Sequence, residues 1–431
     1  MKTIPSLIRS LVCPALIALL TTSAQATSQD YLARAKQAKV GLFVHYVFGQ
    51  TKGQPALYTP MNIEGRKPKD LNELADAFDP KKFADFAEAM GAEYVIFTAF
   101  HAGMNTLYPS QVMGEILPEK VSKRDVIREL QDAMDAKGIP LMLYWHPTDS
   151  HDLSKKELDQ ITAKYPDFGD FVLKLMQETT ARYGSRIAGY WFDAPNGKFS
   201  QTSVPHFKAM ILKDTPNAVI WANFNRRDLC NVTTKESPRP SKDPNTDTWE
   251  TKTTQMCMLS SVGWWAKPKG KIVINARGMF RYTVRLAGTK GQTNGGAAWS
   301  DGPYGDNTWG SGVAENLAEM GKMLKARREA IYGTNPSTSY VTEPNTVQTG
   351  TWGVATDAAD GKTVYLHVLN PPKDSLLEIA KAADGRVFSK ASLLDGRDVS
   401  LKATDKGYTL TLPSGAQWDA VDTVIRLQVQ P

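Results

Sequence analysis

Short apolar segments alternate with helical segments along this sequence, and the alternation ends near residue 335. The apolar segments are rich in β-branched and aromatic residues, and their nearly continuous hydrophobicity is typical of strands buried on both faces of a parallel sheet. We predict a (β/α)8 barrel, with a doubly wound open sheet as the alternative. The eight candidate strands are Val40–Phe48, Glu93–Ala99, Pro140–Trp145, Ile187–Phe192, Ala218–Phe224, Thr248–Thr251, Ile272–Asn275 and Ala297–Trp299.

The pattern changes after Asn335, where helical periodicity ends. Short strand-like segments follow, separated by Gly- and Pro-containing turns. Strands at this spacing predict a small antiparallel β-sandwich over residues 336–431, which places the barrel at residues 27–335. The predicted strands are Gly350–Val354, Thr363–Asn370, Val387–Leu394, Tyr408–Pro413 and Thr423–Val429.

The N-terminus has the pattern of a secretory signal peptide over residues 1–26. Lys2 and Arg9 precede an apolar run, Leu11–Leu20, and an A-x-A pattern ends at Ala26. The apolar run is too short to span a bilayer. We therefore expect an exported protein, secreted or periplasmic, with no membrane partner after the signal is removed.

Composition and motifs exclude several function classes. A formal net charge of +6 in 431 residues, with no long Lys/Arg block, indicates no nucleic-acid partner. Zinc, calcium, phosphate-loop and dinucleotide motifs are absent from the sequence, so we expect neither a metal nor another cofactor. Only Cys230 and Cys257 follow the signal; they could form a disulfide or remain buried thiols.

Polar and aromatic side chains gather where the predicted strands end. Three of the six histidines and five of the ten tryptophans lie at these positions. A barrel places its active site at the carboxyl ends of its strands. Aromatic faces beside hydrogen-bonding groups suit a sugar, which has apolar C–H faces and polar hydroxyls. Taken singly, a Trp at a strand end is more often a core residue than a platform for a ligand.

Asp193 is the strongest catalytic candidate in the sequence. It follows a strand that ends in Trp191 and precedes residues that cannot continue the strand. A carboxylate held at the barrel mouth can act as a nucleophile or general base, although an Asp here can also cap the next loop. Retaining glycosidases need a second carboxyl group about 5–5.5 Å away. Glu250 is the leading candidate for this acid/base role, and Asp247, Asp301 and Glu64 remain alternatives.

Several segments from residue 35 onward resemble the α-L-fucosidases of glycoside hydrolase family 29. The segment from Lys39 to Tyr46 is similar to the family's K-F-G-I-F-I-H-W-G strand, and Ala89–Ala99 is similar to A-G-A-K-Y-V-V-L-T-A. Residues 98–110 match T-A-K-H-H-D-G-F-x-L-W-P-S in length and at both ends. Trp191-Phe192-Asp193 matches W-F-D, and residues 330–333 match the sequence A-I-Y-G before the family's C-terminal sandwich.

The resemblance implies a hydrolase that removes terminal α-L-fucosyl residues from oligo- or polysaccharides with retention and without a metal. Asp193 would then be the nucleophile, and Glu250 would be the acid/base through its Trp-Glu context. The resemblance places sugar contacts at His45, His101, Trp191 and either Tyr144 or Trp145. Tyr46 takes the position of the family's Trp after the first His, so we include it in the predicted pocket.

The sequence departs from the family pattern at the predicted pocket. The family's second His is Ala102 here, and the following D-G-F is replaced by residues 103–105. Changed hydrogen-bonding groups in a sugar pocket can change the accepted sugar. Galactose or a substituted fucose is therefore an alternative glycone, and a non-catalytic glycan-binding protein on the same barrel is an alternative function.

Overall fold

The computed structural model describes residues 30–49, 58–147, 153–193, 204–223, 228–236, 252, 254–261, 263–292, 294–346 and 351–431. The predicted signal peptide lies outside the described residues. Within these ranges, no helix is both long and apolar enough to cross a lipid bilayer.

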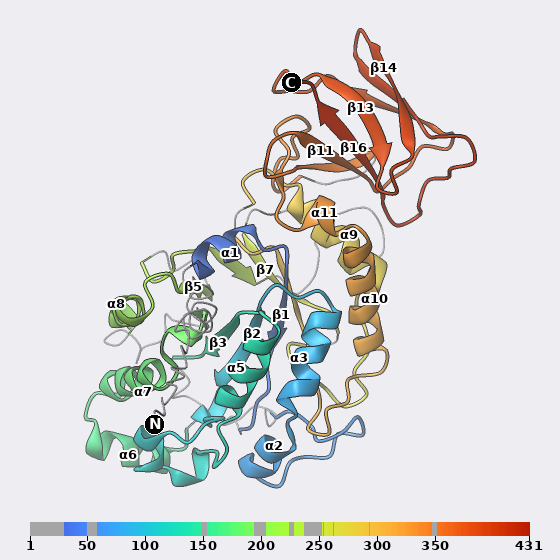
Figure 1. Ribbon diagram of the computed structural model, residues 1–431. Coiled ribbons are helices and arrows are strands. Elements are labelled where there is room, and N and C mark those ends of the chain that lie inside the picture. The colour runs from blue at the N-terminus through green and yellow to red at the C-terminus, as the bar shows by residue number, and fades with distance from the viewer. Residues whose placement is uncertain are drawn as a thin grey trace, which may run out of the picture.

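The first domain is built on an eight-stranded sheet of the barrel type (Figure 1). Its strand order is β5-β4-β3-β2-β1-β8-β7-β6, and each neighbouring pair is parallel. This confirms the predicted (β/α)8 fold. The strands are β1 (Val40–Val44), β2 (Val95–Phe100), β3 (Leu141–Trp145), β4 (Gly189–Phe192), β5 (Val219–Ala222), β6 (Thr234–Glu236), β7 (Gln255–Leu259) and β8 (Ala297–Ser300).

Among the described residues, β5 and β6 do not pair directly with each other. The segment around Asn231, which lies between them in the sequence, forms hydrogen bonds with β5 instead. The backbone N–H of Asn231 donates to the carbonyl of Ile220, and its side-chain oxygen accepts from the N–H of the same residue at 2.8 Å. Its amide nitrogen donates to the carbonyl of Ala218. One side chain thus satisfies backbone groups at the edge of β5 that would otherwise lack partners.

The sixth and seventh predicted strands differ from the observed ones. Residues 248–251 lie outside the described residues. Residues 272–275 do not form a barrel strand, because Asn275 instead caps helix α9 by accepting a hydrogen bond from Gly278 N at 2.7 Å. The observed β6 has one fully buried position of three, and β7 carries Met and Cys, so neither has the β-branched pattern used to find the others.

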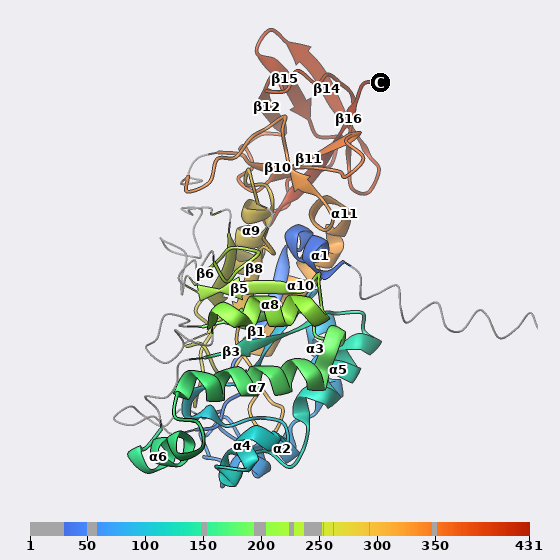
Figure 2. The same ribbon diagram turned by 90° about the vertical axis from the view of Figure 1, so that its left-hand side faces the viewer.

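Helices cover the outside of the sheet, and α7 and α8 lie side by side along it (Figure 2). Asp79, Asp125 and Asn275 accept backbone hydrogen bonds at the starts of α3, α5 and α9, as preferred N-cap residues do. The helices are α1 (Tyr31–Gln37), α2 (Leu71–Ala77), α3 (Pro80–Ala89), α4 (Gln111–Gly114), α5 (Val126–Ala136), α6 (Lys155–Lys164), α7 (Phe168–Tyr183), α8 (Val204–Asp214), α9 (Ala276–Ala287), α10 (Val313–Ala326) and α11 (Arg328–Ile331), with short 3-10 turns η2 (Ala102–Met104), η3 (Pro118–Lys120) and η5 (Gly184–Arg186).

The second domain is antiparallel, as expected for the predicted β-sandwich. Its strand order is β12-β15-β14-β13-β16-β11-β10-β9 around one apolar core. The predicted strands missed the two-residue β9, and they missed β12 and β14, in which exposed residues such as Glu378 and Lys402 interrupt the apolar pattern. The strands are β9 (Asn335–Pro336), β10 (Gly353–Asp357), β11 (Thr363–Val368), β12 (Leu376–Ala380), β13 (Phe388–Leu393), β14 (Asp398–Thr404), β15 (Gly407–Thr411) and β16 (Thr423–Val429).

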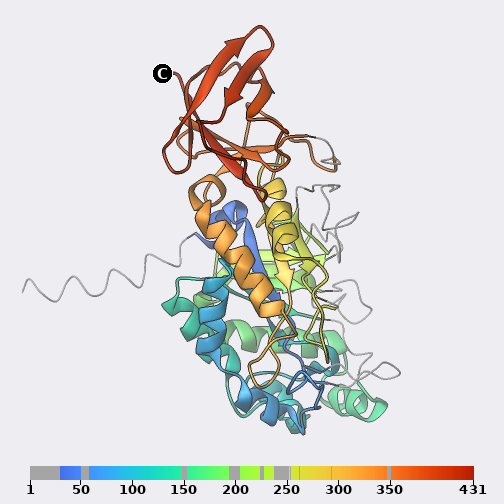
Figure 3. The same ribbon diagram turned by 90° about the vertical axis from the view of Figure 1, so that its right-hand side faces the viewer.

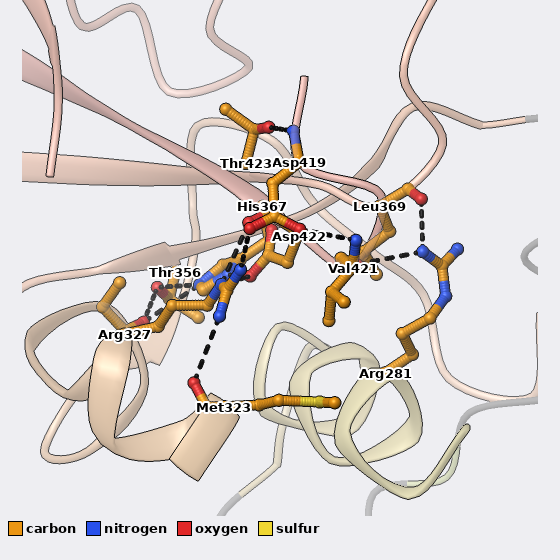
Figure 4. Close-up of polar contacts among 11 residues, drawn as sticks. Arg281, Met323, Arg327, Thr356, His367, Leu369, Asp419, Val421, Asp422 and Thr423 are labelled. Atoms are coloured by element: carbon orange, nitrogen blue, oxygen red, sulfur yellow. Dashed lines mark hydrogen bonds and ion pairs between the residues drawn. The ribbon is translucent and has the colours of Figure 1, made fainter. Parts of the chain in front are cut away.

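The two domains meet where α9 and α11 contact β10 of the second domain, between the yellow and orange helices and the red sheet (Figure 3). Buried Arg281 of α9 donates to the carbonyls of Leu369 and Val421, and Arg327 donates to the carbonyl of Asp422 at 2.9 Å (Figure 4). His367 and Asp422 form a fully buried pair in the same contact. Polar groups paired across the contact therefore join the domains, in addition to apolar packing.

Both cysteines that follow the predicted signal are buried and unbridged in this structure. Cys257 lies in the apolar interior of the barrel, and burial raises the pKa of its thiol far above the ordinary value. Of the two alternatives left open by the sequence, the structure has buried thiols without a disulfide.

Candidate active site

A cavity of about 140 Å³ lies at the carboxyl ends of the barrel strands. This is the end of a (β/α)8 barrel at which active sites are found. Its walls come from residues on or just after β1, β2, β3, β4, β6 and β7, so distant parts of the sequence contribute to one small space. The lining residues are Phe43, His45, His101, Tyr144, Trp191, Asp193, Glu236, Trp264 and Trp265.

Asp193 lies immediately after β4, where its backbone N–H donates to the carbonyl of Trp145 at 2.9 Å. Both carboxylate oxygens accept hydrogen bonds from neighbouring strands. The Tyr144 hydroxyl donates to Oδ2 at 2.7 Å, and the Asn223 amide donates to Oδ1 at 2.9 Å. These bonds orient the carboxylate at the cavity wall.

Glu236 is a second carboxylate in this cavity, and it was not among the residues predicted from the sequence. It ends the short strand β6 and accepts a hydrogen bond of 2.8 Å from the same Asn223 nitrogen that donates to Asp193. Burial, with a further contribution from the charge of Asp193, raises the pKa of Glu236, while the hydrogen bond from Asn223 opposes that rise. A carboxyl group in this environment favours its protonated form more than an exposed Glu does.

The two carboxylates are close enough to act on one bond. Because both bonded oxygens accept from one amide nitrogen, at 2.9 and 2.8 Å, they lie less than about 6 Å from each other. Retaining glycosidases use carboxyl groups separated by about 5–5.5 Å, and inverting ones use a separation of about 6.5–9.5 Å. This geometry is compatible with the shorter separation.

His45 contributes a neutral ring to the cavity. Desolvation lowers its pKa to about 4, although the charge of Asp193 and a hydrogen bond to the backbone of Trp264 oppose this shift. Its Nδ1 atom is buried and makes no hydrogen bond to the residues that the structure describes. A hydroxyl group of a bound molecule could satisfy this nitrogen, since a buried polar atom without a partner is costly.

Aromatic rings form a continuous wall beside the carboxylates. The rings of His101 and Tyr144 stack with centroids 5.2 Å apart, and those of Tyr144 and Trp191 stack at 5.5 Å. Phe43 meets the Trp191 ring edge-on, and Trp265 lies 6.2 Å from the ring of His45. Such a wall offers apolar faces to the C–H groups of a sugar.

The structure therefore brings together five of the predicted site residues: His45, His101, Tyr144, Trp191 and Asp193. Phe43, Glu236, Trp264 and Trp265 join them without having been predicted. The adjacent Trp264-Trp265 pair was visible in the sequence as an aromatic signal, but the two residues follow a strand that was not recognised. Glu236 gave no comparable signal, because β6 is only three residues long.

Tyr46 and Trp145, which were also predicted as sugar contacts, are not among the residues that line the cavity. The Tyr46 hydroxyl donates to the carbonyl of Leu74 in the helical layer at 3.0 Å. Trp145 is fully buried and packs edge-on against Phe207 of α8. Side chains alternate across a strand, so Tyr144 points into the barrel and its neighbour Trp145 points out.

The remaining candidate carboxylates differ in position. Glu250 and Asp247 lie outside the described residues. Asp301 follows β8 and is almost fully buried, where it accepts hydrogen bonds from Gly302 N at 2.7 Å and Ser260 Oγ at 3.3 Å. Glu64 is exposed in a turn. Neither Asp301 nor Glu64 contributes to the cavity lining.

A (β/α)8 barrel with two carboxylates and stacked aromatic rings at its carboxyl end is the architecture of a glycoside hydrolase. The family model described as Alpha-L-fucosidase matches residues 20–269, more than half of the sequence. The chain belongs to the α-L-fucosidase family of glycoside hydrolases.

Individual relatives are distant. Alpha-L-fucosidase 1 of Arabidopsis thaliana is 25% identical over 187 residues, which are 42% of this chain and 32% of that protein. The chain thus spans about a third of the length of this curated relative. The family-29 α-L-fucosidase of Bacteroides thetaiotaomicron, in a structure of a trapped covalent intermediate, superposes with a TM-score of 0.69 at 20% identity, covering 93% of this chain and 96% of that chain. An α-L-fucosidase from Paenibacillus thiaminolyticus gives a TM-score of 0.68 at 18% identity over 94% of this chain and 100% of that chain. These superpositions support the fold.

Proposed function

We propose that this protein is an α-L-fucosidase that removes terminal α-L-fucosyl residues from oligo- or polysaccharides with retention of configuration. The observation that carries the proposal is the pair of carboxylates, Asp193 and Glu236, held by Asn223 in one aromatic-walled cavity. The cavity is far smaller than the roughly 300–1,000 Å³ typical of sites for drug-sized ligands. It therefore suits one sugar ring rather than a length of polysaccharide.

In the first step, an Asp193 oxygen attacks the anomeric carbon and the glycosidic C–O bond breaks. The leaving oxygen takes the proton of Glu236, whose raised pKa suits a general acid. In the second step, water attacks the anomeric carbon, transfers a proton to Glu236 and releases the Asp193 carboxylate. Two inversions at one carbon give net retention.

The acid/base assignment has two candidates that an experiment can separate. Glu236 is favoured by its position in the cavity, whereas Glu250 is favoured by the resemblance in sequence. Each would be replaced by Gln and assayed on an aryl α-L-fucoside with a good leaving group and on one with a poor leaving group. Loss of the true general acid slows cleavage of the poor leaving group far more, and azide then accelerates turnover to give a fucosyl azide of retained configuration.

The nucleophile is tested by Asp193→Ala. This substitution should lower hydrolysis of the activated fucoside at least about a thousandfold, and NMR of the wild-type reaction should show the retained anomer as first product. Wild-type turnover in this variant would refute the role of Asp193, and an inverted first product would refute double displacement.

A different glycone is favoured by Ala102, which provides no ring where the family has a second His. Aryl galactosides and ring-substituted aryl fucosides would be compared with the unsubstituted fucoside by kcat/KM. A higher kcat/KM on one of these substrates than on the fucoside would identify its sugar as the preferred glycone, and the proposed mechanism would stay the same. Binding without turnover of all of them would favour a glycan-binding protein.

Export is part of the same proposal and rests on the signal pattern of residues 1–26. Expression of the full chain in a Gram-negative host, followed by N-terminal sequencing of the periplasmic product, tests it. We expect processing after Ala26. An unprocessed cytoplasmic product would contradict export.

A further inference from the structure

Asn223 occupies an unusual position between the two carboxylates of the cavity. It follows β5 directly and is 3% exposed. Its single amide nitrogen donates to Asp193 Oδ1 at 2.9 Å and to Glu236 Oε2 at 2.8 Å. The opposite amide orientation would set an oxygen acceptor against two carboxylate oxygens, so the pairing itself determines which end of the amide faces them.

This arrangement addresses an electrostatic problem of the proposed reaction. Two carboxylates that share one amide donor in a partly buried site repel each other when both are ionised. The proposed first step removes negative charge from Asp193, which becomes an ester, and creates it on Glu236, which loses its proton. The second step reverses the transfer. A donor that contacts both groups is positioned to stabilise the charge in either location.

We propose that Asn223 is a positioning residue that holds the two carboxylates at their working separation and supports the negative charge as it moves between them. The inference rests on the proposed function, because the charge moves only if Asp193 and Glu236 act as nucleophile and acid/base. No proton passes through the amide: its two N–H bonds remain intact, and only the hydrogen-bond strengths change. Both chemical steps therefore depend on it.

Asn231 is a matched control on the same strand edge. Asn231 uses both ends of its amide, and its partners are the backbone groups of Ile220 and Ala218 rather than carboxylates. Asn231→Ala should lower the unfolding temperature without altering the pH dependence of catalysis. Asn223→Ala removes the shared donor, and Asn223→Ser retains a hydroxyl that can serve one carboxylate at a time.

The experiment measures burst and steady-state kinetics on an aryl α-L-fucoside together with the pH profile of kcat/KM. For Asn223→Ala we expect both glycosylation and deglycosylation to slow by about 10- to 100-fold, with KM changed much less. Loss of a donor to the ionised form of Glu236 should also move the alkaline limb of the profile to higher pH. Asn223→Ser should give rates and an alkaline limb that lie between those of the wild-type protein and those of Asn223→Ala.

The Glu236→Gln background provides a second check. There the alkaline limb due to Glu236 is absent, so adding Asn223→Ala should cost less than it does in the wild-type protein. Wild-type rates in correctly folded Asn223→Ala, or an unmoved alkaline limb, would overturn the inference. Should that variant fail to fold, Asn223→Ser decides by the same two criteria. Asp193→Ala distinguishes failure of the proposed function from failure of the role of Asn223. If Asp193→Ala is active, the proposed function is wrong. If it is inactive while the Asn223 variants have wild-type kinetics, only the role of Asn223 is wrong.

Discussion

His367 and Asp422 form a fully buried pair at the contact between the two domains. Nδ1 of His367 lies 2.8 Å from Oδ2 of Asp422, and Nε2 lies 3.0 Å from the carbonyl oxygen of Ala330 at the end of α11. Arg327 approaches the same Asp422 oxygen at 3.6 Å. The imidazole thus bridges a carboxylate of the second domain and the last helix of the first.

Replacement of His367 should destabilise the protein. His367→Leu leaves the Asp422 carboxylate buried with one partner fewer, and breaking a buried pair on one side typically costs about 3–5 kcal/mol. Urea unfolding followed by tryptophan fluorescence measures the loss. The exposed pair between Lys390 and Asp398 is the control, because Lys390→Ala should cost less than about 1 kcal/mol. Equal unfolding midpoints for His367→Leu and wild type would contradict the structural role.

Asp301 should make stability depend on pH. Burial raises its pKa to about 6 against opposing hydrogen bonds from Ser261, Gly302 and Ser260. The folded state therefore holds this proton more tightly than the unfolded chain, whose Asp pKa is about 3.9. The resulting stabilisation is fully present below the unfolded pKa and is lost as pH rises through about 6.

Asp301→Asn carries no such titration. Its unfolding free energy relative to wild type should rise by about 2–3 kcal/mol between pH 4 and pH 7. Denaturant unfolding at several pH values checks this difference. A difference between the two proteins that does not vary with pH would show that Asp301 does not titrate in this range.

Two tyrosines at strand ends should respond differently to loss of their hydroxyls. Tyr144→Phe removes a donor to Asp193, so kcat/KM on an aryl α-L-fucoside should fall by about 10- to 100-fold with little change in unfolding temperature. Tyr46→Phe removes a buried hydrogen bond to Leu74, which should cost about 1 kcal/mol of stability without changing kcat/KM. If Tyr46→Phe lowered kcat/KM and Tyr144→Phe lowered only stability, Tyr46 rather than Tyr144 would lie in the cavity.

Trp265 should contribute to substrate binding. Its ring lies beside His45, and the ammonium group of Lys267 lies 5.1 Å from the ring centroid. Trp265→Ala should raise KM by about tenfold through loss of an apolar contact face. Trp309 packs on Phe86 in the helical layer, so Trp309→Ala should lower stability and leave KM unchanged. An unchanged KM in Trp265→Ala would place this ring outside the sugar site.

Cys257 should be unreactive in the native protein. The thiolate is the reactive form, and burial both blocks access and raises the pKa of this thiol. A thiol-specific chromogenic reagent should modify Cys257 only after denaturation, as mass spectrometry of labelled peptides would show. Rapid labelling of the native protein would contradict this burial.

Sequence by itself was sufficient for the parts of the fold that depend on local patterns. Near-continuous apolar segments identified β1 to β5 and β8, since strands buried on both faces leave that pattern. It failed at β6 and β7 because a three-residue strand carries no period and because Met and Cys are weak strand signals. At Gly296, just before β8, the φ of +64° favours glycine locally, whereas the 2.1 Å approach of a Cβ to Lys39 O is a constraint that only the folded barrel creates.

The residues at strand ends, including Asp193 and His45, were likewise predictable, because a parallel barrel brings all carboxyl ends of its strands to one face. The tertiary structure alone decided which of them share a cavity. Side chains at adjacent positions point to opposite faces of a strand, which separates Tyr144 from Trp145. Asn223 lies 30 residues from Asp193 and 13 from Glu236, and the closure of the barrel, rather than any sequence spacing, brings these three side chains within hydrogen-bonding distance.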